Sequence, residues 1–226
     1  MALHGLIFDV DGVIADTEAV NARVSIHVLE SLFGLRGVRR EDFEAGLGRG
    51  AEAYLRVAAR VHGVELSDAQ VARAAAARQE GVIASLLAEP LPAFPGVIEL
   101  LTAARSRPDF EVAIATSSAR AMSQPVLESA GVPWREIVYV TGSDVTHKKP
   151  HPELFLTAAR RLGVPPARCV VVEDAPDGVA AAHAAGARAI AVTNSVSAER
   201  LAAAERVVDS LVAVSIDDVA RMVDSR

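Results

Sequence analysis

The sequence has one cysteine, few aromatic residues and a modest excess of acidic over basic side chains. The lone Cys169 excludes a disulfide within the chain, and its apolar surroundings favour a small core residue over a reactive thiol. Aromatic residues make up only 4% of the 226 residues, so side chains that could stack on bases are scarce. Together with the formal net charge of −6, this scarcity argues against a nucleic-acid partner.

Long apolar runs are also lacking, since no segment approaches the roughly 20 residues that a membrane span needs. Residues 1–8 show no basic leader followed by an apolar segment and a cleavage site. We therefore expect a cytoplasmic chain without a membrane partner, present as a monomer or a small homo-oligomer. Hydrophobic residues make up 51% of the sequence, enough to bury the core of one large domain with a smaller inserted one.

The most informative pattern is the pair Asp9 and Asp11, which follows the apolar segment 3–8. That segment is typical of a buried strand, and open α/β sheets bind ligands beyond the carboxyl ends of their strands. Residues two apart on a strand share a face, so both carboxylates would enter one crevice. One could attack a phosphorus or carbon centre while the other, kept protonated, serves the leaving group. An ordinary turn is the alternative; a calcium loop is excluded because its twelfth residue would be Val20.

Two further segments offer groups that bind phosphate. Thr116 and Ser117 follow the short strand pattern 111–115, where hydroxyls and backbone amides suit phosphate oxygens, although a helix cap would use the same residue types. Lys149 precedes Pro150 in a stretch that stays out of the next helix, and it could hold a phosphoryl group as a point charge. A solvated basic loop is the alternative there.

A pair of acids follows another buried-strand pattern. Glu173 and Asp174 come directly after the apolar residues 169–172. Adjacent carboxylates suit a hard cation such as Mg²⁺, and acids also favour the start of a helix. All these polar segments follow an apolar strand or lie in the basic loop between strands. That shared position favours one common site over several unrelated structural roles.

The patterning changes twice along the chain and divides it into two parts. Helical periodicity extends from Thr17 to about Glu89, with helices predicted over Glu18–Phe33, Ala51–Val61 and Ser67–Leu87. After the proline-rich residues 90–96, strands and helices alternate, with strands near Glu111, Ile137, Cys169, Arg188 and Arg206. We expect an α/β fold with a doubly wound, mostly parallel sheet formed by residues 1–16 and 91–226. Residues 17–90 would form an inserted α-helical cap domain.

The ordered set of motifs resembles the haloacid dehalogenase superfamily of phosphohydrolases. Within it, the chain is similar to the branch that contains β-phosphoglucomutase, CbbY and phosphoglycolate phosphatase. The resemblance spans most of the predicted core and rests on Asp9-Val10-Asp11-Gly12-Val13-Ile14, Thr116, Lys149 before Pro150-His151-Pro152, and Glu173-Asp174 with Asp177-Gly178.

The resemblance implies a phosphatase that acts on a small phosphorylated metabolite. Asp9 would be the nucleophile and form an aspartyl-phosphate, and Asp11 would protonate the leaving alcohol and later deprotonate water. Thr116 and Lys149 would hold the phosphoryl oxygens. Dehalogenases of the superfamily lack a carboxylate at the position of Asp11, which makes dehalogenation a poor fit.

The resemblance further implies a Mg²⁺ cofactor. Its ligands would be Asp9, the backbone carbonyl of Asp11 and Asp174, with Glu173 contributing directly or through water. Such a metal agrees with the chemistry, because phosphoryl transfer spreads negative charge over oxygens that a cation stabilises.

The predicted cap holds the candidates for substrate specificity. Mutase members of the branch carry a histidine near the position of Asn21, and an amide cannot take up the proton of a sugar hydroxyl. Arg49 and Arg78 would grip a second anionic group or sugar hydroxyls, or else be solvated on helix faces. Two alternatives to the sugar phosphatase stay open: a phosphosugar mutase like β-phosphoglucomutase, and a non-catalytic regulatory protein that binds phosphate.

Overall fold

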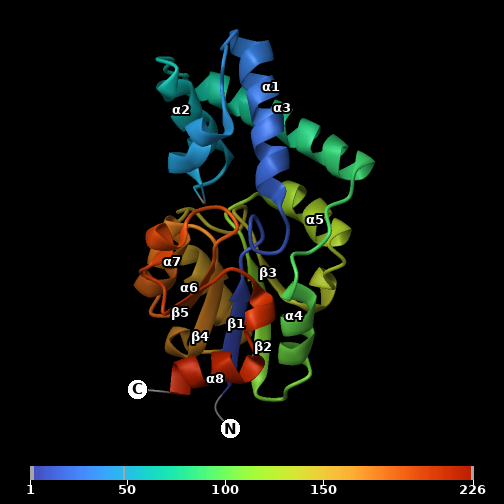
Figure 1. Ribbon diagram of the computed structural model, residues 1–226, viewed down its shortest axis with the longest axis vertical. Helices are drawn as coiled ribbons and strands as arrows, with labels where there is room; N and C mark the ends of the chain where they lie inside the picture. Colours follow the sequence, from blue (N-terminus) through green and yellow to red (C-terminus); the bar gives the residue numbers. More distant parts are fainter. Residues whose placement is uncertain (1–2, 48, 225–226) are drawn as a thin grey trace.

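The computed structural model describes residues 3–47 and 49–224 and is built around a six-stranded parallel sheet (Figure 1). The predicted fold class is confirmed; the predicted core also included residues 1–2 and 225–226, which lie outside the described residues. The strand order is β3-β2-β1-β4-β5-β6, with β1 between β2 and β4 at the centre. The strands are β1 (His4–Phe8), β2 (Phe110–Ala115), β3 (Val138–Val140), β4 (Cys169–Glu173), β5 (Arg188–Val192) and β6 (Arg206–Val208).

Helices cover both faces of the sheet, which explains why residues 6–8 of β1 and 170–172 of β4 are apolar on both faces. Leu6 and Phe8 of β1 belong to one hydrophobic cluster, and Ile7 between them belongs to the other. The predicted core residue Cys169 is fully buried in the second cluster. The first face is covered by α4 (Val97–Arg105), α5 (Arg120–Ser129) and α8 (Ile216–Asp224), and the second by α6 (Glu153–Leu162) and α7 (Pro176–Ala184).

Three helices lie beyond the carboxyl ends of the strands, at the top of Figure 1. They are α1 (Thr17–Phe33), α2 (Ala51–Val61) and α3 (Asp68–Ala88), and the 3₁₀ helix η1 (Arg40–Gly46) lies between α1 and α2 in the chain. We call residues 17–88 the helical layer. The three helices predicted for this region are therefore confirmed. Local signals set their ends: the Ser67 hydroxyl accepts a hydrogen bond from the Gln70 amide, and Gly34 ends α1 with a φ of 68°.

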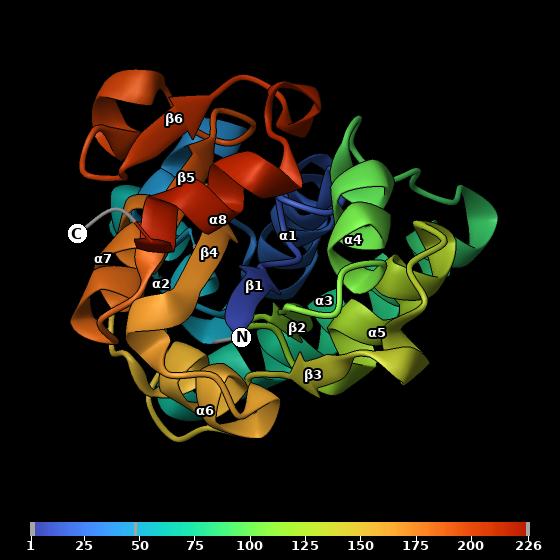
Figure 2. The same cartoon turned by 90° about the horizontal axis from the view of Figure 1, so that it is seen from below.

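On the first face, α8 covers the lower part of the sheet, and no helix is predicted there from the sequence. Val219 and Val223 turn inward, and the helix packs against β1 and β4 (Figure 2). Short 3₁₀ helices complete the chain at η2 (Trp134–Glu136), η3 (Pro166–Arg168), η4 (Ala198–Leu201) and η5 (Leu211–Ala213). Among the described residues, every helix is too short or too polar to cross a membrane.

Candidate active site

A pocket lies between the carboxyl ends of the strands and the helical layer, and both parts of the fold line it. The sheet side contributes six residues named as site candidates from the sequence: Asp9, Asp11, Thr116, Ser117, Lys149 and Asp174. The helical layer contributes Glu18, Asn21, Tyr54 and Arg78. Residues more than 160 positions apart in the sequence thus face one space, because parallel strands bring their carboxyl ends to the same edge.

A buried ion-pair network lies at the floor of the pocket. Lys149 Nζ lies 2.7 Å from Asp9 Oδ1 and also donates a hydrogen bond to Glu173. The other oxygen of Glu173 accepts the amides of Asp174 and Ala175 at 3.0 and 3.2 Å, so its carboxylate is fixed in place. Burial opposes the charge on Lys149, but the two carboxylates outweigh this effect and raise its pKa. The lysine is therefore a permanent cation beside Asp9.

The acids of this network form a group suited to a cation. One oxygen each from Asp9, Glu173 and Asp174 lies within 4.8 Å of the others, and all three residues are buried. Burial, reinforced by the neighbouring carboxylates, raises the pKa of Asp9 to about 8 despite Lys149, and that of Asp174 well above its usual range. Ionisation of all three carboxylates beside one lysine would leave excess negative charge, and a bound divalent cation would neutralise that charge.

Close backbone packing shapes this group of acids. Gly12 has a φ of 76°, and a Cβ there would lie 1.8 Å from Asp174 Oδ2. Gly178 lies on the first turn of α7, where a Cβ would lie 2.0 Å from the carboxyl carbon of Glu173. The glycines thus leave the room that these two carboxylates occupy. Asp174 also accepts a hydrogen bond from the Ser195 hydroxyl.

Three hydroxyl groups position the carboxylate of Asp11. Thr17 Oγ1 donates to Oδ1 at 2.8 Å, whereas Ser118 Oγ and Thr116 Oγ1 donate to Oδ2 at 2.6 and 3.2 Å. Asp11 is only half-buried and faces the pocket. Its carboxyl group is therefore held beside the pocket by hydroxyl groups, with no ion pair to it among the residues that the structure describes, which suits a group that gives and takes a proton.

The loop after β2 offers an unused donor. The Ser117 hydroxyl oxygen is buried and makes no hydrogen bond to any part of the chain that the structure describes. Its backbone is fixed from below, since Lys148 Nζ donates to the carbonyl oxygens of Ser117 at 3.1 Å and Gly142 at 2.8 Å. A buried hydroxyl without a partner at the wall of a pocket suits an anionic ligand.

The helical layer adds a second polar network above the acids. Tyr54 donates a hydrogen bond to Glu18, and burial raises the pKa of Glu18 to about 7. Arg78 Nε donates to Ser25 Oγ at 3.0 Å, and its guanidinium carbon lies 5.4 Å from the centre of the Tyr54 ring. Burial lowers the pKa of Arg78. Asn21 is buried beside this network.

Two residues named from the sequence lie outside the lining of the pocket. Arg49 is exposed at the rim, where its Nε lies 2.5 Å from Asp177 Oδ2 on α7. Its side chain therefore joins the helical layer to the sheet domain. Glu173 lies beneath the lining and reaches the pocket through Lys149.

Sequence reasoning missed several residues of the site. Ser118 and Ser195 each follow a strand, so the strand-end pattern that indicated Thr116 could have identified them. Tyr54 and Glu18 carried no such signal, because helix packing alone brings them together.

Buried carboxylates with a buried lysine, surrounded by hydroxyls at the carboxyl edge of a parallel sheet, are typical of enzymes that transfer phosphoryl groups. The chain belongs to the haloacid dehalogenase-like hydrolases, whose family model matches residues 3–186. The family predicted from the motifs is thus confirmed.

Relatives and solved structures agree with this assignment. The chain is 35% identical over 192 residues to fructose-1-phosphate phosphatase YqaB of Escherichia coli (strain K12), covering 83% of this chain and 95% of that protein. It is 33% identical over 222 residues to Protein SUPPRESSOR OF QUENCHING 1, chloroplastic, of Arabidopsis thaliana, covering 96% of this chain but only 20% of that much longer protein.

Among solved structures, CbbY from Rhodobacter sphaeroides in complex with phosphate superposes with a TM-score of 0.83 at 27% identity. The match covers 96% of this chain and 99% of that one. The predicted branch is confirmed, and the chain is a phosphoric monoester hydrolase.

Proposed function

We propose that this enzyme is a Mg²⁺-dependent phosphatase that hydrolyses a small sugar phosphate through an aspartyl-phosphate on Asp9. The observation that carries the proposal is the contact of 2.7 Å between Lys149 Nζ and Asp9 Oδ1, with Asp11 facing the same pocket. The name of the relative YqaB, a fructose-1-phosphate phosphatase, supports the substrate class.

In the first step, a carboxylate oxygen of Asp9 attacks the phosphorus atom of the ester. The bond between phosphorus and the ester oxygen breaks, and Asp11 gives its proton to the departing alcohol. The hydroxyls of Thr17, Thr116 and Ser118 hold Asp11 in the orientation that this transfer needs.

In the second step, Asp11 takes a proton from a water molecule, whose oxygen attacks the phosphorus. The bond between phosphorus and Asp9 breaks, inorganic phosphate leaves, and both aspartates return to their starting states. Lys149 and the Ser117 hydroxyl would stabilise the phosphoryl oxygens in both steps, joined by the Thr116 hydroxyl when it turns from Asp11 to the bound phosphoryl group.

The acid group fits Mg²⁺, because its donors are carboxylate oxygens whose charge, when all three are ionised, exceeds that of the single lysine. Asp9 and Asp174, with the backbone carbonyl of Asp11, would hold the ion, and Glu173 would support it directly or through water. The bound cation would supply positive charge to the phosphoryl oxygens and favour the ionised form of Asp9.

We also propose that residues 17–90 act as a cap that selects the substrate and excludes water. Its support is that Glu18, Asn21 and Arg78 line the pocket opposite the acids. Polar groups of this kind suit the hydroxyls of a sugar. Within the described ranges, ion pairs join the cap to the sheet domain between Arg49 and Asp177 at 2.5 Å and between Arg200 and Glu44 at 3.1 Å.

Hydrolysis is favoured over the mutase alternative because Asn21 lines the pocket at this position. A mutase must move a proton to and from a sugar hydroxyl of its bound intermediate, and an amide has no basic group for this task. The regulatory alternative has no observation in its favour, since Asp9 and Glu173 are both present and in contact with Lys149.

The test is phosphate release from a panel of sugar phosphates, phosphoglycolate and nucleotides, with Mg²⁺ and with chelator. Asp9→Asn replaces the nucleophilic carboxylate with an amide and should abolish release. Asp16→Asn is the matched control, because asparagine also caps a helix and Asp16 is exposed at the start of α1. Interconversion of β-glucose 1-phosphate without release would identify a mutase, and full release by Asp9→Asn would contradict the proposed mechanism.

A further inference from the structure

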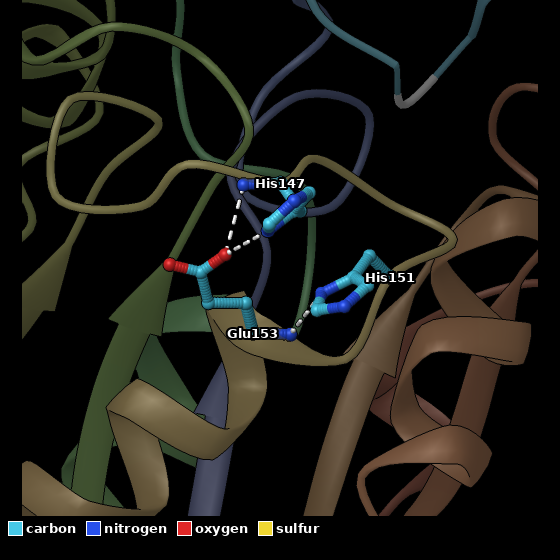
Figure 3. A group of neighbouring side chains, drawn as sticks. All are labelled: His147, His151 and Glu153. Atoms are coloured by element: carbon cyan, nitrogen blue, oxygen red, sulfur yellow. Dashed lines mark hydrogen bonds and ion pairs between the residues drawn. The ribbon is translucent and has the colours of Figure 1, made fainter.

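A second group of metal-binding residue types lies on the loop that carries Lys149. His147 and His151 stand on either side of the lysine pair 148–149, and Glu153 begins α6 directly afterwards (Figure 3). One ligand atom from each of these three residues lies within 4.8 Å of the others. The three are absent from the lining of the active-site pocket, so this group of side chains is separate from it.

The side chains already converge on Glu153. His147 Nδ1–H donates to Glu153 Oε2 at 2.9 Å, and the Glu153 amide donates to His151 Nδ1 at 3.3 Å. The two imidazole rings are 4.5 Å apart at an angle of 34°. Figure 3 shows both rings facing the first turn of α6.

The spacing between His147 Nδ1 and Glu153 Oε2 matches that between two ligand atoms of a single transition-metal ion. Zn²⁺ binds imidazole nitrogen and carboxylate oxygen at about 2.0–2.1 Å, so two ligand atoms at angles of roughly 90–109° lie about 2.9–3.4 Å apart. The contact of 2.9 Å between His147 Nδ1 and Glu153 Oε2 falls at the lower end of this range. On binding, the His147 proton would move from Nδ1 to Nε2, which leaves the ring neutral.

The site is also open to a solvated ion. The His147 side chain is 63% exposed, so water can reach the ion and complete its coordination. Glu153 supplies a charged donor, because hydrogen bonds from the Thr146 and His147 amides lower its pKa to about 2. The neighbouring lysines point elsewhere: Lys148 binds carbonyl oxygens and Lys149 binds buried carboxylates.

We propose that His147, His151 and Glu153 bind a transition-metal ion of the Zn²⁺ class, which fastens the Lys149 loop to the first turn of α6. Two imidazoles and one carboxylate suit such an ion, whereas Mg²⁺ prefers oxygen donors alone. The proposed binding does not depend on the phosphatase mechanism. Its consequence for the enzyme is a loop held in the position that places Lys149 against Asp9.

The chemistry of the two metal-binding groups makes them separable in one experiment. Excess Mg²⁺ would occupy the oxygen-only acids of the active site and leave the imidazoles free. Zn²⁺ is then titrated into the full-length protein in competition with a chromophoric chelator. The test variant is the double substitution His147→Ala and His151→Ala, and His27→Ala is the matched control, since His27 is an exposed histidine on α1.

We expect one Zn²⁺ site in the unaltered protein and in His27→Ala. The double variant should bind that ion more weakly by at least roughly tenfold, because even the partners of metal ligands contribute about 10–100-fold to affinity. Absence of Zn²⁺ binding in the unaltered protein, or equal affinity in the double variant, would overturn the proposal.

Two further readouts test the ligands and the loop directly. Cu²⁺ in place of Zn²⁺ should show nitrogen couplings in its electron paramagnetic resonance spectrum, and the double variant should lose them. Zn²⁺ should also slow hydrogen exchange of the Thr146 and His147 amides in the unaltered protein. Exchange that Zn²⁺ leaves unchanged would refute the fastening of the loop.

Discussion

The buried carboxyl group of Glu18 should make the stability of this enzyme fall as the pH rises from 4.5 to about 7. Burial raises its pKa from 4.5 to about 7, against the opposing hydrogen bond from Tyr54. Between pH 4.5 and about pH 7, Glu18 is therefore protonated in the folded state and ionised in the unfolded chain. The stabilisation is therefore complete below pH 4.5 and is lost as the pH approaches 7, and the shift of about 2.5 units corresponds to roughly 3 kcal/mol.

The substitution Glu18→Gln isolates this effect, because glutamine still accepts the Tyr54 hydrogen bond but has no proton to lose. Urea unfolding at pH 5 and pH 8 would give the free energy of unfolding for both proteins. From pH 5 to pH 8, the free energy of unfolding of Glu18→Gln should rise relative to that of the unaltered enzyme by about 2.5 kcal/mol. Other titrating groups cancel in that difference when they are independent of Glu18.

Tyr54→Phe provides a control with a distinct outcome. Loss of its hydrogen bond removes an influence that lowers the pKa of Glu18, so the decline in stability should extend to higher pH. A difference between Glu18→Gln and the unaltered enzyme that stays constant from pH 5 to pH 8 would refute the reasoning.

Three further substitutions test the site. Gly178→Ala places a Cβ 2.0–2.2 Å from the Glu173 carboxyl atoms, and we expect a loss of about 1–3 kcal/mol in urea unfolding together with a fall in kcat/KM. Lys149→Met leaves Asp9 and Glu173 without their buried cation; stability should fall by about 3–5 kcal/mol unless metal compensates, and steady-state assays should detect no phosphate release. Ser117→Ala removes a buried hydroxyl without a partner among the described residues, so the free enzyme should keep or gain about 1 kcal/mol of stability while KM rises. Equal KM values for Ser117→Ala and the unaltered enzyme would show that the Ser117 hydroxyl does not contribute to phosphate binding.

The sheet side of the site could be predicted from the sequence for a simple geometric reason. Apolar runs mark parallel strands, and the polar residues that follow them meet at one edge whatever their separation in the chain. Asp9, Thr116 and Asp174 were found in this way. Ser195 carries the same signal after β5, but no charged residue stands next to it in the sequence, so the segment does not stand out as a site.

Contacts of the helical layer could not be predicted in the same way. Glu18 and Tyr54 lie 36 residues apart on two helices, and their contact depends on how α1 and α2 pack. The sequence predicts that Arg49 either grips a substrate group or is solvated on a helix face, but it gives no sign of the ion pair that Arg49 forms with Asp177 on α7. Periodicity identifies the buried face of a helix but not its partner across the interface.

The most direct test of the proposed mechanism is to trap the phosphoryl group on Asp9. Asp11→Asn with p-nitrophenyl phosphate suits this purpose, because p-nitrophenolate leaves without a proton whereas attack by water still needs Asp11 as a base. A rapid acid quench followed by peptide mass spectrometry should show one equivalent of p-nitrophenolate released and one phosphoryl group on the peptide that contains Asp9. Turnover of this ester by the unaltered enzyme, with neither a burst nor phosphorylated Asp9 in the variant, would contradict the account.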